Sequence, residues 1–161
     1  MNNQQELLTK SVLDTWRANI TRTDALIDSL TDEQLEQEIA PGKNRGIYVL
    51  GHLAAVHDRM MPLLGFGEQQ FAHLDGPFLT SPDKAVAELP ATADIRTYWK
   101  EANKALDHHI SGQQPGDWFQ KHTSVSDEDF AKESHRNKLS VLVSRTNHAA
   151  YHYGQLMLLK K

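Results

Sequence analysis

The sequence predicts an all-α protein built as a four-helix bundle. Apolar side chains recur every three or four residues in four long segments, at about residues 4–30, 46–64, 92–110 and 136–160. No stretch of useful length alternates apolar and polar residues as a half-buried strand does. Two longer connections separate the last three segments, an arrangement that suits a helical bundle. The length of 161 residues predicts a single domain over 1–161 with a buried core.

The first predicted helix covers about residues 4–30 and is followed by a signal for a new helix. Its apolar stripe includes Leu13, Trp16 and Ile27 at helical spacing. Thr31 is followed three residues later by Gln34, a capping-box pattern that predicts the start of a short second piece.

The second predicted helix, about residues 46–64, carries histidines on two different apolar faces. His57 shares one face with Leu53 and Met60, whereas His52 lies about 140° away around the helix. Periodicity leaves open which histidine faces the centre of the bundle, and it favours His57 slightly. Pro62 falls late in this helix, and the glycines that follow are expected to end it.

Residues 68–92 form the first connection, and residues 117–135 form the second. Proline and glycine break the first connection, in which we expect one turn of helix at 83–88. The acidic run at 127–129 of the second connection is expected to be solvated. Three aromatic residues are expected to anchor this connection to the bundle: Trp118, Phe119 and Phe130. Connections this long in a compact domain are commonly functional or cover a site.

The fourth predicted helix, about residues 136–160, contains His148 and His152 four residues apart. Such a pair lies on one face of a helix, about 6 Å apart along its axis, and two imidazoles so placed can hold one metal ion. The alternative is a pair of core histidines without a metal. Ala149 follows the first histidine, so the His-Glu-x-x-His pattern of zinc proteases, with its general base, is absent.

Composition excludes several classes of function. The net charge is −4 and no basic run occurs, so nucleic-acid binding is not expected. No apolar run reaches the roughly 18 residues of a membrane span and no secretion signal is evident, so we expect a cytoplasmic protein. The chain has nine histidines and no cysteine, so any thiol in its chemistry must come from a small molecule.

The stretch HAAYHYGQL, from His148 to Leu156, together with Gly51-His52-Leu53, resembles the DinB / YfiT-like superfamily over nearly the whole chain. The resemblance implies a four-helix bundle with up-down-down-up topology, often a homodimer. It also implies a divalent metal ion, such as nickel, zinc or iron, held by three side chains that are commonly histidines. By position, these ligands are His52, His148 and His152, so the resemblance selects His52 rather than His57. Three protein ligands leave coordination positions open for water or substrate.

The resemblance further implies a metal-dependent transferase or isomerase. Its nucleophile would be an exogenous low-molecular-weight thiol, such as bacillithiol, mycothiol or glutathione, which attacks a small-molecule electrophile. One alternative is a hydrolase with a metal-activated water, for which His57 is a weak candidate base. Another is a non-catalytic metal-binding stress-response protein. The sequence assigns no catalytic residue, and Gln155 is expected to make a structural hydrogen bond rather than to orient a water.

Overall fold

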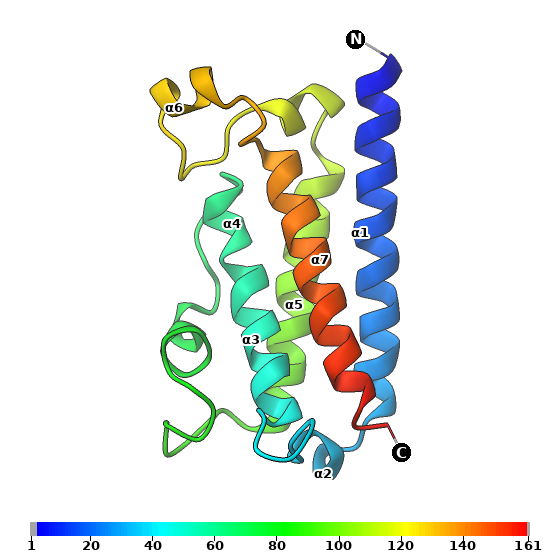
Figure 1. Ribbon diagram of the computed structural model, residues 1–161, viewed down its shortest axis with the longest axis vertical. Helices are drawn as coiled ribbons and strands as arrows, with labels where there is room; N and C mark the ends of the chain where they lie inside the picture. The colour runs from blue at the N-terminus through cyan, green and yellow to red at the C-terminus, as the bar shows by residue number, and fades with distance from the viewer. Residues whose placement is uncertain (1–2, 161) are drawn as a thin grey trace.

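The computed structural model describes residues 3–160, which form a bundle of four long helices (Figure 1). They are α1 (Asn3–Ser29), α3 (Gly46–Asp58), α5 (Thr92–Ser111) and α7 (Lys138–Met157). Figure 1 shows α1 and α7 running in one direction and α3 and α5 in the other, which is the up-down-down-up order. No strand occurs among residues 3–160. The predicted all-α bundle is confirmed.

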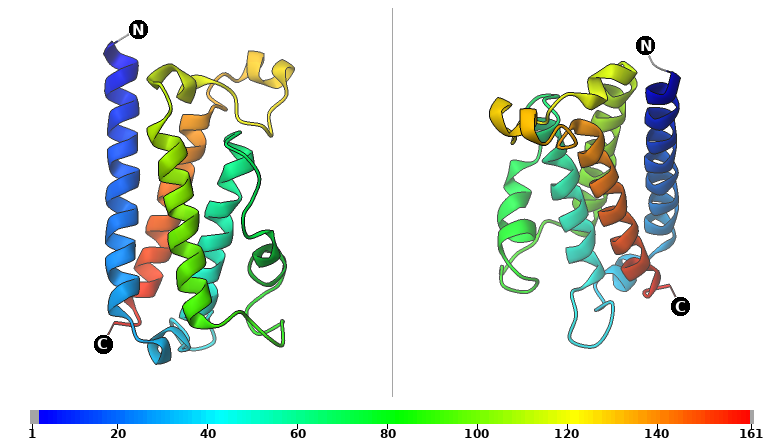
Figure 2. Two further views of the ribbon diagram at one scale, coloured as in Figure 1. Left: turned by 180° about the vertical axis from the view of Figure 1, so that it is seen from behind. Right: turned by 45° about the horizontal axis from the view of Figure 1, so that its top comes forward.

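The helices pack mainly as two parallel pairs. Helix α3 lies against α5 and α1 lies against α7, and α3 also contacts α7, as the views in Figure 2 illustrate. One core cluster includes the fully buried Ile27, Leu53 and Trp99, and a second includes Trp16 and Leu142. Burial of each such large side chain contributes about 1.5–3 kcal/mol, which is what holds the bundle together. Among the described residues, no helix is both long enough and apolar enough to cross a membrane.

The ends of the helices follow local sequence signals. Short helix α2 (Asp32–Leu35) begins with the predicted capping box, in which Thr31 Oγ1 accepts from Gln34 N at 3.1 Å and Thr31 N donates to Gln34 Oε1 at 2.8 Å. The second predicted helix is divided at residue 59 into α3 and the short α4 (Met60–Leu63). Pro62 explains the division, because it has no N–H to donate to the carbonyl of residue 58. Gly65, at φ 72°, then ends α4.

The first connection contains two short helical turns, η1 (Ala72–Leu74) and η2 (Gly76–Thr80). The helical turn predicted at 83–88 is wrong, because residues 83–87 form turns and bends and Glu88 lies in irregular backbone. Asp83 is held by Arg45, which donates to it from its backbone N at 2.7 Å and from Nη2 at 2.8 Å. Lys84 has a φ of 69°, which a helix cannot accommodate. Long-range pairing therefore determines the shape of this segment.

The second connection contains η3 (Pro115–Phe119) and α6 (Asp127–Lys132). Trp118 is buried and serves as the predicted anchor, while Phe119 and Phe130 are partly buried. The acidic run at 127–129 is exposed, as expected, and forms the first turn of α6. Thr123 ties this connection to α4, because its backbone N donates to the carbonyl of Leu63 at 3.0 Å.

Candidate metal centre

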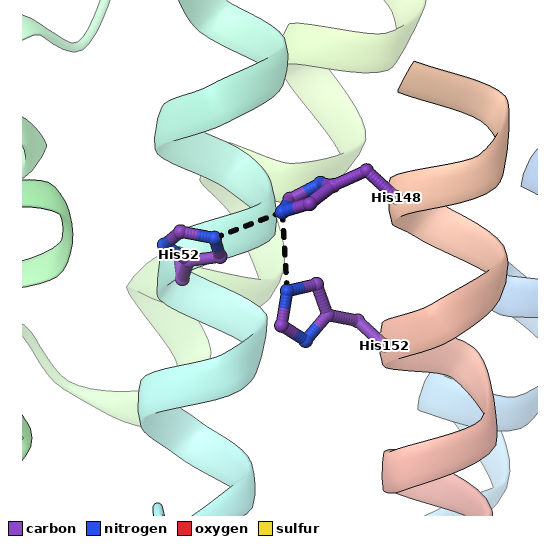
Figure 3. Close-up of side chains that lie close together, drawn as sticks. All are labelled: His52, His148 and His152. Atoms are coloured by element: carbon purple, nitrogen blue, oxygen red, sulfur yellow. Dashed lines mark hydrogen bonds between the residues drawn. The ribbon is translucent and has the colours of Figure 1, made fainter. Parts of the chain in front are cut away.

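Three histidine side chains from two facing helices converge on one point (Figure 3). His52 projects from α3, and His148 and His152 project from α7. The Nε2 atom of His148 lies 3.1 Å from Nε2 of His52 and 3.1 Å from Nε2 of His152. All three side chains are partly exposed, so small molecules can reach them. The structure thus brings together the three residues that the resemblance selected.

Hydrogen bonds on the outer side of two rings determine which nitrogen atoms face the centre. His52 Nδ1 lies 2.9 Å from the carbonyl oxygen of Phe78, and His152 Nδ1 lies 2.7 Å from Gln155 Oε1. Both oxygens can only accept, so in the neutral rings each Nδ1 carries the proton and each Nε2 presents a lone pair. His148 Nε2 can donate a proton to only one of these lone pairs. The centre therefore suits a cation better than it suits a hydrogen-bond network.

Two spacings between the nitrogen atoms also fit a first-row divalent ion, and all three atoms lie within 4.8 Å of one another. Metal–nitrogen bonds of about 2.0–2.1 Å place two ligands roughly 2.8–3.4 Å apart at bond angles between a right angle and the tetrahedral angle. The two Nε2–Nε2 distances of 3.1 Å fall inside this interval. No aspartate or glutamate belongs to the cluster in the part of the chain that the structure describes. Three neutral imidazoles would leave the charge of such an ion uncompensated, which favours an anionic further ligand.

Gly51 explains how the first connection reaches the cluster. The Phe78 ring is fully buried and packs directly on Gly51, where an added Cβ would lie 2.3 Å from Phe78 Cε1. One turn earlier on the same face of α3, the Tyr48 hydroxyl donates to the carbonyl of Ser81 at 2.6 Å. The absence of a side chain at Gly51 therefore lets η2 approach α3 closely enough for the Phe78 carbonyl to orient His52.

Burial keeps two of the three rings neutral. The pKa of His148 falls to about 4, chiefly because of burial and then because of the neighbouring His152 and His52 rings and the charge of Arg145. Burial also lowers the pKa of His152, although its hydrogen bond with Gln155 acts in the opposite direction. Neutral imidazole is the form that binds metal ions, so protons compete weakly for these rings at neutral pH.

His57, which periodicity favoured slightly, lies outside the cluster. Its ring is fully buried between Trp16 and Trp99, with ring centroids 5.0 and 4.9 Å away. His57 Nδ1 donates to Asn103 Oδ1 at 2.8 Å, and burial is the main cause that lowers the pKa of His57 to about 3. His57 is therefore a neutral core histidine, and its burial excludes it as a base acting on a water at the cluster.

The structural hydrogen bond expected of Gln155 is present, and its partner is His152. Two other groups near the cluster, the Phe78 carbonyl and Arg145, were not expected from the sequence. The Phe78 carbonyl could not be anticipated, although a glycine inside a helix directly before His52 is a sign of close approach by another segment. Arg145 lies three residues before His148, and only the structure reveals that its Nε is buried without a hydrogen-bond partner among the described residues.

The sequence of the chain matches one known protein family over a region that contains the histidine cluster. A family model described as the DinB superfamily matches residues 15–156, a region that includes all three clustered histidines. A search of curated proteins gives no match. Because the family model covers most of the 161 residues, the chain belongs to the DinB superfamily.

Proposed function

We propose that the protein binds a divalent metal ion through His52, His148 and His152 and acts as a metal-dependent transferase. Its nucleophile is an exogenous low-molecular-weight thiol. The observation that carries the proposal is the convergence of three Nε2 atoms, with more lone pairs than protons, at a partly exposed position. Membership of the DinB superfamily supports the proposal. Nickel, zinc and iron are all suitable, because imidazole is a good ligand for each of them.

A divalent ion bound here would lower the pKa of a bound thiol or water, so that the nucleophile forms near neutral pH. The protein's own role is to fix the ligand rings, through the Phe78 carbonyl and Gln155, while the three side chains stay partly exposed. In the reaction, the thiol sulfur forms a bond to the electrophilic carbon and the leaving group departs with its bonding electron pair. The thiol proton passes to solvent. The chain has no cysteine, so the sulfur belongs to a small molecule.

Elemental analysis of the protein purified without a polyhistidine tag tests the metal site. We expect about one nickel, zinc or iron ion per chain in the wild type, and loss of this ion in His52→Ala and His148→Ala, because each change removes one of three ligands. His108→Ala is the control, since His108 is exposed on α5 and lies outside the cluster. A wild-type protein that holds no metal after reloading and dialysis would contradict the proposal.

Activity assays then separate the three functions that share this site. Metal-dependent turnover of an alkylating electrophile only in the presence of an added thiol supports the transferase. Metal-dependent turnover of an ester without a thiol would favour a hydrolase with an activated water. A slowly exchanging metal that raises the melting temperature, without either activity, would favour a non-catalytic metal-binding protein.

We also propose that the protein is a cytoplasmic homodimer. The resemblance supports this state, and so do two exposed apolar side chains, Leu8 on α1 (50% exposed) and Val143 on α7 (42% exposed). Both line one hollow of about 560 Å³, and contiguous exposed apolar surface is common at protein interfaces. Light scattering after size exclusion is expected to give a dimer for the wild type and for Leu158→Glu, a control elsewhere on the surface. It is expected to give a monomer for Leu8→Glu and Val143→Glu.

A further inference from the structure

A second candidate site lies along helix α7 from the histidine cluster. It is a cavity of about 310 Å³ between α4, α7 and the second connection, a volume at the lower end of the range for small-molecule sites. Four basic side chains and two serines contribute to its lining: His122, His135, Arg136, Ser140, Ser144 and Arg145. No aspartate or glutamate lines it in the described part of the chain. Its charge therefore suits an anion.

Two of the basic side chains have buried nitrogen atoms without a protein partner. Arg145 Nε and His122 Nδ1 are both buried, and neither makes a hydrogen bond with any residue between 3 and 160. Burial lowers the pKa of Arg145, yet a guanidinium group keeps its proton in proteins. A buried cationic N–H without an acceptor is costly and rare in native structures. The cavity thus carries a positive charge whose donor requires an acceptor.

The walls of the cavity are fixed in position. The second connection is held by the bond from Thr123 N to the Leu63 carbonyl, and Lys138 N donates to the carbonyl of Gln120 at 3.0 Å. Arg136 is already engaged, because its Nη1 lies 3.2 Å from Glu133 Oε2. Arg145 therefore remains as the uncompensated charge in a preorganised cavity.

Arg145 also places the cavity beside the proposed metal site. It precedes His148 by three residues, which corresponds to about 4.5 Å along the axis of α7. Residues three and seven positions apart lie on one face of a helix, so Arg145, His148 and His152 are neighbours on the same side. The charge of Arg145 is therefore close enough to His148 to act on its ring.

We propose that this cavity binds the anionic group, a carboxylate or a phosphate, of a substrate whose reacting atom lies at the histidine cluster. A guanidinium group pairs with either anion through two parallel hydrogen bonds, which would hold the substrate in one orientation. The assignment to a substrate rests on the proposed function, whereas the anion site stands without it.

The test uses the full-length chain, freed of metal with a chelator, and inorganic phosphate and malonate as probes. The pH is about 8, above the ordinary pKa of imidazole, so that anions do not bind to protonated histidines of the cluster. In nuclear magnetic resonance spectra, we expect a saturable change of the Arg145 Nε–H signal. Arg145→Met is expected to weaken binding by at least about tenfold, or about 1.4 kcal/mol. Arg17→Met, which removes the same charge from the exposed surface of α1, is expected to bind the probes like the wild type.

Arg145→Lys is the second variant, in case Arg145→Met alters the fold as judged by circular dichroism. Lysine keeps the positive charge but lacks the planar guanidinium group that forms two parallel hydrogen bonds. Weaker phosphate binding by this variant, with an intact fold, supports the inference. The absence of a saturable change at Arg145, or equal binding by wild type and Arg145→Met, overturns it. Metal content is measured on separate samples that have not been treated with chelator. A chain that binds metal but neither probe leaves the proposed function intact, and one that binds the probes but never a metal overturns the assignment to a substrate.

Discussion

Gly51 offers a direct test of how the fold supports the candidate metal centre. A methyl group at this position would lie 2.3 Å from Phe78 Cε1 and 2.4 Å from Phe78 Cζ, well inside van der Waals contact. The Phe78 ring is fully buried and has no solvent to move into. Gly51→Ala therefore forces either η2 or α3 to shift, and the Phe78 carbonyl that orients His52 shifts with it.

Two effects of different size follow from this shift. Overpacking a dense core costs about 1–3 kcal/mol, and the better helix propensity of alanine offsets up to about 1 kcal/mol of that cost. We therefore expect Gly51→Ala to lower the free energy of unfolding of the metal-free protein by about 1–2 kcal/mol. Loss of a hydrogen bond that orients a ligand histidine typically lowers metal affinity by about 10–100-fold, and we expect the same for His52.

Chelator competition measures the metal affinity, and urea unfolding of the metal-free protein measures stability. Gly154→Ala is the matched control, because Gly154 also lies inside a helix, two residues after His152, and its added Cβ has no atom within 4 Å. This variant is expected to gain up to about 1 kcal/mol of stability and to keep its metal affinity. Equal stability and equal metal affinity of Gly51→Ala and Gly154→Ala would refute the reasoning from Phe78.

Three further predictions concern buried or supporting side chains. The pKa of His57 is about 3 in the folded state and about 6.5 in the unfolded state. Between these pH values only the unfolded state binds a proton at this residue, so the stability of the metal-free protein falls as the pH drops from about 6.5 towards 3. Urea unfolding at several pH values should show a flatter dependence for His57→Gln. Gln155→Leu should weaken metal binding by about 10–100-fold in chelator competition while leaving the melting temperature of the metal-free protein nearly unchanged. Asp58→Ala leaves the backbone N–H groups of Gln70 and Phe71 without their carboxylate acceptor, at a cost of about 1–3 kcal/mol each, and an unchanged melting temperature would contradict this.

The helices could be predicted because their signals are local. The segment predicted at 92–110 corresponds to α5 (Thr92–Ser111), and the segment at 46–64 corresponds to α3 and α4 together. The interior of the first connection could not be predicted, because contacts between distant residues determine it. Phe78 packs on Gly51, and Asp83 pairs with Arg45, 38 positions away in the sequence. No property of residues 83–88 alone reveals that pairing.

The choice between His52 and His57 shows why periodicity was insufficient for the site. Helix α3 is buried on both faces, so each histidine lies among apolar neighbours in the sequence. One face places His57 between Trp16 of α1 and Trp99 of α5, and the other places His52 opposite α7. Which face meets α7 depends on the order of the helices in the bundle. A family resemblance carries that information, whereas the apolar pattern of one helix does not.

The two connections contribute different chemistry to two regions along helix α7. The first connection supplies a backbone carbonyl from Phe78, which fixes the tautomer and orientation of His52. The second connection supplies His122 to the basic cavity that Arg145 shares, next to His148. A rigid bundle can hold three ligand rings, but it offers few groups with which to recognise a small molecule. Long connections fastened to the bundle by Thr123 and Phe78 can add such groups without disturbing the helices that carry the histidines.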